Sequence, residues 1–304
     1  MSATLIEFSN DLADLVERTS GSVIAVPEGG RVGVSGTVWR EGVAITAAHT
    51  IHGLDEVKVI LPAGREAKAT VAGRDFGTDI AVLKLSETGK GATLADVSQV
   101  RPAEIVLVIG RRGADGLAVA HGLVGAVGGP WRTSIGARVD RWLSLHLDPF
   151  PGFSGGPVIN ARGEVLGMAT SGRRRSAVVI TTGTVNRIVE QILQHGRIRR
   201  GFIGVAVQPV VFPEGSSQAV GIEVDRGLLV TSVAVGSVAE EARLMLGDVI
   251  VGIEGEPIRS ARDLQWVLDG ESVGKSIGLE VIRGGQLMKI PVTVREKAID
   301  REKG

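Results

Sequence analysis

The sequence contains no cysteine and no tyrosine, and aromatic residues make up only 3% of its 304 residues. Without cysteine the chain forms no disulfide and offers neither a thiol nucleophile nor a thiolate metal ligand. Its 34 basic and 34 acidic side chains balance, which excludes a globally basic nucleic-acid-binding protein. No apolar run reaches the ~20 residues that a membrane-spanning helix requires. We therefore expect a soluble protein without a nucleic-acid partner and without a membrane span.

The start of the sequence bears on the cellular compartment. No basic segment followed by an apolar stretch is present there, so no signal peptide is visible. The apolar residues of the segment 5–15 are interrupted by acidic and amide side chains, namely Glu7, Asn10, Asp11 and Asp14. We expect a cytoplasmic location for the chain as written, and a periplasmic one if the true start lies upstream.

Short apolar runs separated by some of the 43 glycines dominate the rest of the chain. Runs rich in valine and isoleucine, such as 57–61 and 80–85, predict the strands of a β-sandwich or barrel. The spacing of apolar residues predicts helices over 184–195 and 260–268. Gly196 is expected to end the first helix, and Ser260 to cap the second.

The polar segment 196–201 marks a boundary between two domains. We predict an N-terminal arm over residues 1–20, a mainly β domain over 21–196, a small α+β domain over 197–298, and a charged tail over 299–304. Because the sequence from Arg295 onward is strongly charged, we expect it to fray.

Three segments of the first domain carry residues suited to nucleophilic catalysis. His49 ends an apolar strand, Asp79 opens another, and Ser154 lies in a glycine-rich turn. A serine hydroxyl becomes a nucleophile when a neighbouring base takes its proton, and an aspartate can hold a histidine in the tautomer that does so. The glycines near Ser154 allow the amides of Gly152 and Ser154 to form an oxyanion hole.

Each piece alone has a simpler interpretation. A lone histidine after a strand is more often a surface or satisfied core residue, and an aspartate or a Ser-Gly-Gly-Pro segment is often only part of a turn. The conjunction of all three, each at the edge of a strand and in the order His, Asp, Ser, favours a catalytic triad.

Several motifs resemble the catalytic blocks of trypsin-like serine proteases of the bacterial HtrA family. They are Thr46-Ala-Ala-His49, Asp79-Ile-Ala-Val-Leu-Lys84, Gly152-Phe-Ser154-Gly-Gly-Pro157 and Gly163-Glu-Val-Leu-Gly-Met168. The resemblance implies a mainly β protein, with a trypsin-like double β-barrel and the triad between the barrels. It also implies that Thr170, Ser171 and Gly172 pair with the substrate backbone.

The second domain resembles the PDZ domain of the same family. The likeness rests on Gly201-Phe-Ile-Gly-Val205, Gly227-Leu-Leu-Val-Thr-Ser-Val, Gly236-Ser-Val-Ala-Glu-Glu-Ala-Arg-Leu244 and Gly247-Asp-Val-Ile250. It implies that Phe202, Ile203 and Gly204 receive a peptide carboxylate while the strand from Val205 pairs with the peptide. The alternative is that 201–205 is merely a core strand.

The sequence departs from the family pattern at three places. Phe153 replaces the usual asparagine before the serine, and we expect it to anchor the loop by packing. Arg243 stands where the PDZ pattern prefers glycine, which suggests a different turn. The loop before Ser154 is shorter than usual and contains Pro149 and Pro151, so we expect it to order more readily.

Asp148 lies in that shortened loop and permits two interpretations. It either recognises a basic side chain before the cleaved bond, as an acidic residue at this offset does in trypsin, or is the family's ordinary structural aspartate. We favour the structural role and expect small aliphatic residues before the cut.

The resemblance therefore predicts a serine endopeptidase that cleaves unfolded or damaged proteins through an acyl-enzyme. Its expected partners are polypeptide substrates and peptide C-termini, and a homotrimer is expected from the family alone. The alternative is a peptide-binding or chaperone protein that has kept the protease fold without activity. No cofactor is expected, and His52 lacks neighbours in sequence that would make a metal site with His49.

Overall fold

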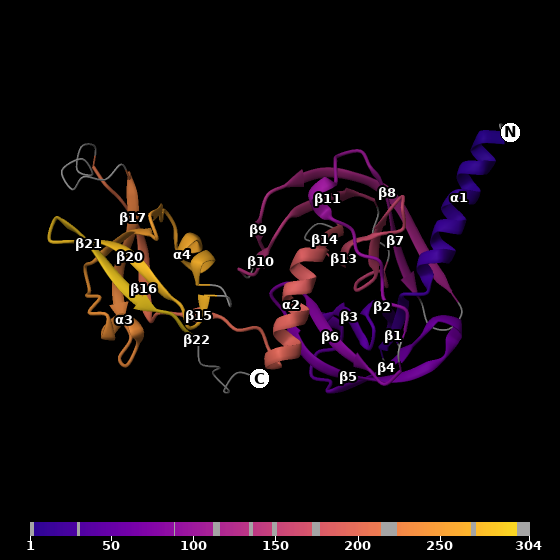
Figure 1. Ribbon diagram of the computed structural model, residues 1–304, viewed down its shortest axis with the longest axis horizontal. Coiled ribbons are helices and arrows are strands. Elements are labelled where there is room, and N and C mark those ends of the chain that lie inside the picture. Colours follow the sequence, from indigo (N-terminus) through magenta and orange to yellow (C-terminus); the bar gives the residue numbers. More distant parts are fainter. Residues whose placement is uncertain are drawn as a thin grey trace. The chain divides into compact units, whose positions relative to one another are not determined.

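Two separately packed units make up the chain in the computed structural model (Figure 1). The structure describes residues 3–28, 31–87, 89–111, 116–133, 136–147, 151–171, 177–213, 224–268 and 272–296. The first unit is Met1–Ile198 and the second is Arg199–Gly304, against a predicted boundary after residue 196.

The first half of the first unit is a closed antiparallel barrel. In spatial order its strands are β1 (Val23–Glu28), β2 (Arg31–Arg40), β3 (Val43–Ala47), β6 (Ile80–Leu85), β5 (Glu66–Asp75) and β4 (Glu56–Ile60). Short 3-10 helices lie between β3 and β4 (Ala48–Thr50) and between β4 and β5 (Pro62–Gly64). The first of these helices carries His49 directly after β3.

A second closed barrel completes this unit. Its strands in spatial order are β11 (Trp142–His146), β14 (Ala177–Thr181), β13 (Val165–Ser171), β12 (Pro157–Asn160), β7 (Ile105–Arg111) and β8 (Leu117–Gly128). A 3-10 helix, Val97–Gln99, precedes it, and the short pair β9 (Trp131–Arg132) and β10 (Arg138–Val139) lies between β8 and β11. The predicted double barrel is confirmed.

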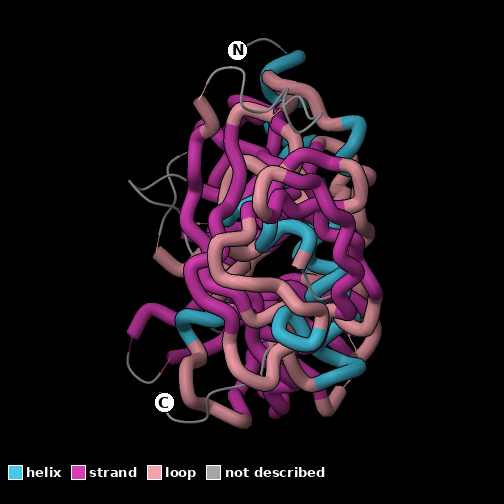
Figure 2. The backbone as a smooth tube through the Cα atoms, turned by 90° about the vertical axis from the view of Figure 1, so that its left-hand side faces the viewer, coloured by secondary structure: helices cyan, strands magenta, loops and turns pink. Residues whose placement is uncertain are grey.

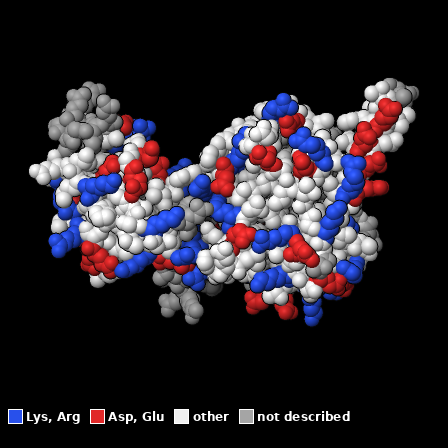
Figure 3. All heavy atoms as spheres, in the orientation of Figure 1, with Lys and Arg blue, Asp and Glu red and all other residues white. Residues whose placement is uncertain are grey.

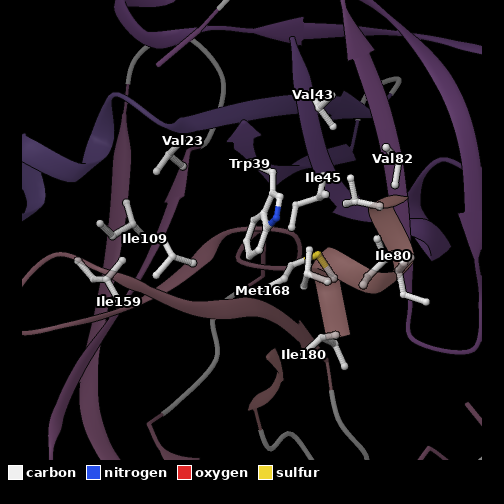
Figure 4. Close-up of a cluster of buried hydrophobic side chains, with 14 of the residues drawn as sticks. Val23, Trp39, Val43, Ile45, Ile80, Val82, Ile109, Ile159, Met168 and Ile180 are labelled. Atoms are coloured by element: carbon white, nitrogen blue, oxygen red, sulfur yellow. The ribbon is translucent and has the colours of Figure 1, made fainter. Parts of the chain in front are cut away.

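Apolar side chains from both barrels pack into one cluster (Figure 4). Trp39 and Ile45 come from the first barrel, and Ile109, Met168 and Ile180 come from the second. All five are buried. Because burying each such side chain stabilises the fold by ~1.5–3 kcal/mol, this shared core holds the two barrels against each other.

Two helices flank the barrels: α1 (Ala3–Ser20) and α2 (Thr182–His195). Helix α2 buries Val185, Ile188, Val189 and Ile192 on the face that the apolar spacing predicts. Gly196 ends it with a φ of 71°, and its amide donates to the carbonyl of Ile192. The helix begins two residues before its predicted start, and the predicted arm is an 18-residue helix.

The second unit is an antiparallel sheet with two short helices (Figure 2). The sheet order is β16 (Val205–Val211), β17 (Arg226–Val233), β18 (Val249–Ile253), β20 (Ser276–Arg283) and β21 (Gln286–Thr293), with β19 (Glu256–Pro257) beside β18. The helices are α3 (Val238–Glu241) and α4 (Ala261–Val267). Ser260 and Asp263 cap α4 reciprocally, which confirms the predicted helix start.

The expectation that the chain frays from Arg295 onward is wrong for its first two residues. They form β22 (Arg295–Glu296), which pairs with β15 (Gly201–Phe202). Ion pairs from Arg295 to Glu241 and from Glu296 to Arg199 accompany this pairing. The charged side chains therefore stabilise an ordered strand, while the predicted tail 299–304 lies outside the described residues.

The backbone at Arg243 adopts the conformation that glycine would take there, so the turn does not change to accommodate arginine. Arg243 itself adopts a φ of 58°, the left-handed backbone that glycine favours. The Arg283 guanidinium donates to the carbonyl of Arg243, which holds this conformation.

Charged side chains of both signs are interspersed over each unit (Figure 3), in keeping with the balanced composition. Within the described part of the chain, no helix is long and apolar enough to cross a membrane.

Candidate active site

His49 and Asp79 form a doubly hydrogen-bonded pair at the ends of β3 and β6. The His49 amide donates to Asp79 Oδ1 at 2.9 Å, and His49 Nδ1 lies 2.8 Å from Asp79 Oδ2. In the tautomer that suits a carboxylate acceptor, Nδ1 carries the proton and Nε2 keeps its lone pair. About half of the His49 side chain is exposed, so Nε2 is accessible to a reacting group.

A tight turn before β6 determines where Asp79 points. Asp79 has a φ of 60°, in the left-handed region that aspartate tolerates better than most residues other than glycine. The buried Asp75 carboxylate accepts hydrogen bonds from the amides of Gly77 and Thr78 and from the Thr78 hydroxyl. This side chain–backbone turn fixes the segment that carries Asp79.

Asp79 is charged at neutral pH. Burial alone would raise the pKa of its carboxyl, but the hydrogen bonds from His49 and Thr170 lower it more. The pKa therefore lies below the ordinary value of 3.8. The carboxylate can orient His49 and stabilise the imidazolium that forms when His49 accepts a proton.

The turn that carries Ser154 depends on glycine at two positions. Gly152 has a φ of 99°, a backbone conformation that residues with a Cβ rarely adopt. At Gly155 a Cβ would lie 2.1 Å from the carbonyl oxygen of Ser35 and 2.8 Å from Thr46 Oγ1. Glycine at 155 thus lets the serine turn lie directly against β2 and β3, the strand that leads to His49.

Thr170 connects the serine turn with the His49–Asp79 pair. The Thr170 hydroxyl donates to Asp79 Oδ2, and its neighbour Ala169 accepts a hydrogen bond from the Gly155 amide at 2.9 Å. The serine turn and the Asp79 carboxylate therefore bond to neighbouring residues of β13. The structure pairs His49 with Asp79 directly and holds the turn of Ser154 beside that pair.

The predicted substrate-binding residues fall partly within the described structure. Thr170 and Ser171 pair with Val178 and Ala177 of β14, while the register between β13 and β12 ends at Met168. Ala169 still bonds to Gly155 and Gly156 on the β12 side, so the edge of β13 beyond Ala169 is where the predicted substrate strand would align. Asp148 and Gly172, and Pro149 of the shortened loop, lie outside the described residues.

Phe153 packs into the core of the second barrel. Its side chain is only 4% exposed and belongs to the apolar cluster around Val108, Val158 and Leu166. The expectation that Phe153 anchors the loop by packing is confirmed.

The residues predicted to receive a peptide carboxylate cluster where β15 turns into β16. Phe202 lies in β15 and is partly exposed, Ile203 is buried, and Gly204 makes the turn with a φ of 89°. Val205 begins β16, the first strand in the sheet order, and packs with apolar residues of the core that includes Leu264 of α4. A strand at this edge can accept an extended peptide.

A buried ion pair supports this second unit. Asp248 is 1% exposed, and both of its oxygens accept hydrogen bonds from Arg283 at 2.7 Å. Burial would raise the pKa of Asp248, but the Arg283 guanidinium and the Met245 amide together hold it below the ordinary value of 3.8.

We predict that Asp248→Asn lowers the stability of the second unit by about 3 kcal/mol at pH 7, because it breaks a buried pair whose arginine stays partly exposed. The wild-type contribution is present above pH 3.8 and is lost as the pH falls through the lowered pKa, so Asn at this position removes that pH dependence. Hydrogen exchange of residues 226–253 measures the effect at pH 7 and pH 3. Asp225→Asn, which disrupts an exposed pair with Arg226, is the control and should leave exchange unchanged.

The His52 ring packs near the ring of Phe76. Its imidazole lies 5.3 Å from the ring of Phe76, centroid to centroid. Among the described residues, no three His, Asp or Glu side chains converge in a way that could hold a metal ion.

Comparison with known proteins is consistent with this geometry. Residues 34–168 match the trypsin-like peptidase domain family, and residues 201–294 match the PDZ domain family. A probable periplasmic serine endoprotease, DegP-like, of Bartonella henselae is 32% identical over 83% of this chain and 50% of its own length. The serine protease Do-like HtrA of Bacillus subtilis is 30% identical over 95% of this chain and 66% of its own length.

The chain belongs to the HtrA family. A solved structure of the HtrA-type protease AlgW with a tripeptide superimposes with a TM-score of 0.76 at 26% identity, over 95% of this chain and 98% of that one. The chain spans half to two thirds of the length of the curated relatives described above.

Two parts of this HtrA-family site were not found from the sequence. The sequence marked Thr170 as a backbone partner of substrate, whereas its side chain bonds to Asp79, which lies 91 positions earlier in the chain. Asp75 was not singled out, although an aspartate two residues before a glycine is a known turn signal.

Proposed function

We propose that this chain is a serine endopeptidase that hydrolyses unfolded or damaged proteins through an acyl-enzyme. The observation that carries the proposal is the ionised, doubly hydrogen-bonded Asp79–His49 pair beside the glycine turn of Ser154. The names of the relatives, which are serine endoproteases, support the same reaction class.

In the proposed reaction His49 Nε2 takes the proton of Ser154 Oγ as that oxygen attacks the scissile carbonyl carbon. The amides of Gly152 and Ser154 stabilise the oxyanion of the tetrahedral intermediate. His49 then gives the proton to the leaving amine, and the peptide bond breaks. Water, with His49 again as base, hydrolyses the ester on Ser154 and regenerates the hydroxyl.

We propose that the residue before the cleaved bond is a small aliphatic one. The alternative is a basic residue whose side chain binds Asp148. Incubating the purified chain with unfolded casein and sequencing the products tests both activity and preference. Valine, alanine or isoleucine before the cut supports the proposal, and lysine or arginine assigns recognition to Asp148. If casein stays uncleaved and a serine-reactive phosphonate does not label the chain, the proposal is wrong. The alternative is then a peptide-binding protein that has kept the protease fold without activity.

We propose that the second unit binds the carboxyl end of peptides between β16 and α4, with Phe202, Ile203 and Gly204 around the carboxylate. A fluorescent peptide with an aliphatic final residue and a free carboxylate should bind, and its C-terminal amide should not. Equal affinity of the two peptides would refute carboxylate recognition.

The short loop before Ser154 is proposed to make protease activity independent of this ligand. Casein cleavage at the same rate with and without the free-acid peptide would support that proposal, and cleavage only with the peptide would refute it.

Assembly and compartment stay predictions, and only the trimer rests on the family alone. Light scattering after size exclusion distinguishes a trimer from a monomer. The names of several relatives describe them as periplasmic, which supports that compartment over the cytoplasm for this chain. Cell fractionation with an antibody to the chain decides between the two.

A further inference from the structure

Ser35 in β2 is fully buried and uses every one of its polar groups in a hydrogen bond. Its hydroxyl donates to the carbonyl of Gly152 at 2.6 Å and accepts from the amide of Arg111 at 2.9 Å. Its own amide donates to the carbonyl of Ser154 at 3.1 Å, and its carbonyl accepts from the Thr46 hydroxyl at 2.7 Å. One residue of the first barrel thus bonds to the serine turn of the second barrel at two places, with its hydroxyl to Gly152 and with its backbone amide to Ser154.

We propose that Ser35 is a positioning residue for the oxyanion hole. This inference rests on the proposed function, because it concerns the amides of Gly152 and Ser154 that would stabilise the tetrahedral intermediate. Ser35 holds the carbonyl group of each of these two residues. Each held carbonyl is joined to the amide of the same residue through one Cα, so holding it limits the rotations that would turn that amide away before substrate binds.

Gly152 is the part of the turn that most needs such an anchor. Glycine has the widest choice of backbone conformations, and Gly152 has a positive φ of 99°. The hydrogen bond from Ser35 restrains the orientation of the peptide group that follows Gly152. A preorganised donor costs no rearrangement during the reaction, which is what makes such donors effective.

Gly110 in β7 provides the space for this arrangement. A Cβ on Gly110 would lie 2.8 Å from Cδ1 of Phe153 and 3.0 Å from Oγ of Ser35. The missing side chain lets the Phe153 ring and the Ser35 hydroxyl occupy the same small region. Three successive residues of the turn are therefore held: Gly152 and Ser154 by Ser35, and Phe153 by burial of its ring.

Arg111 holds the far side of the Ser35 hydroxyl in place. Its side chain is 7% exposed, and its Nε donates to the carbonyl of Val23 in β1 at 2.8 Å. The Arg111 side chain thus ties this residue to the first barrel, and with it the backbone amide that donates to the Ser35 hydroxyl. Because the Ser35 oxygen accepts from this amide on one side, its proton is free to be donated to the Gly152 carbonyl on the other.

The test compares Ser35→Ala with Thr184→Val in the full chain. Thr184 is also fully buried in the first unit, and its hydroxyl accepts from the amide of Asp140 at 2.9 Å. Both substitutions delete a buried hydroxyl that accepts a backbone amide, but Thr184 has no role in the site. Thermal unfolding followed by circular dichroism reports the loss of stability of each variant, and kinetics are measured where both are folded.

We expect Ser35→Ala to lower kcat for a peptide substrate roughly 10- to 100-fold with KM nearly unchanged, less than the ~10²–10³-fold loss of a complete oxyanion donor. The affinity for a peptide aldehyde, which forms a tetrahedral adduct with its oxygen in the oxyanion hole, should fall by the same factor. Thr184→Val should leave both quantities as in the wild type. A merely structural role of Ser35 would lower stability without this selective loss of aldehyde affinity.

If Ser35→Ala does not fold, Ser35→Cys fills the site with a somewhat larger group that donates far more weakly, and the same two losses are expected. Wild-type kcat and aldehyde affinity in a folded Ser35 variant overturn the inference while leaving the protease intact. An inactive wild type that also fails to react with a phosphonate overturns the proposed function itself. The two failures are therefore distinguishable.

Discussion

Replacing Ser154 with alanine is expected to lower kcat for peptide hydrolysis about 10⁶-fold, the loss typical of removing a serine nucleophile. The hydroxyl is the atom that attacks the carbonyl, and a methyl group cannot form the acyl-enzyme. The backbone of the turn should survive, because Ser35, the close approach at Gly155 and the buried Phe153 ring hold it without the Ser154 side chain. Residual rates above those of water then come from the oxyanion hole and from substrate binding.

The measurement is the initial rate on a fluorogenic peptide that contains the cleavage sequence found with casein. Ser98→Ala is a suitable control, because Ser98 lies in an exposed 3-10 helix of the same unit and should retain the full rate. Peptide affinity of the second unit should be unchanged in both variants. If Ser154→Ala kept even a tenth of the wild-type rate, Ser154 would not be the nucleophile.

Asp79→Asn is expected to reduce kcat about 10⁴-fold while leaving the fold intact. Asp79 Oδ2 accepts hydrogen bonds from both His49 and Thr170, and Oδ1 accepts from the His49 amide. An asparagine can present only one oxygen, so an NH₂ group faces at least one of these donors. His49 then moves its proton to Nε2, and the nitrogen that should take the serine proton no longer has a lone pair.

Asp96→Asn makes a matched control, because Asp96 is an exposed carboxylate that caps a 3-10 helix and touches no residue of the site. This variant should keep the wild-type kcat. The His49 tautomer in Asp79→Asn can be read from nitrogen chemical shifts of ¹⁵N-histidine-labelled protein. A wild-type rate in Asp79→Asn, or an unchanged tautomer with a lowered rate, would remove Asp79 from its proposed role.

The sequence predicts those parts of the site that depend on short motifs. His49, Asp79 and Ser154 each lie in a local pattern of small residues, strands and glycines, and the structure brings these segments together. The capped helix α4 and the glycine end of α2 are likewise local, because a cap forms within four residues of the helix end. Local signals of this kind do not need knowledge of the fold.

The supporting contacts could not be predicted because they join distant positions. Thr170 reaches Asp79 across 91 positions, and Ser35 reaches Gly152 across 117. A serine inside a β-branched run gives no sign in the sequence that its hydroxyl faces another barrel. The ordered strand at Arg295–Glu296 was missed for the same reason, since its partner β15 lies some ninety positions earlier.

The central claim is that His49 activates Ser154 as a nucleophile, and a phosphonate probe tests it most directly. Intact mass spectrometry, followed by peptide mapping, locates the adduct and gives its rate of formation in the wild type and in His49→Ala. We predict a single adduct on Ser154 that forms at least a hundredfold more slowly without His49. An adduct on another residue, or one on Ser154 at the same rate in both proteins, would contradict the account.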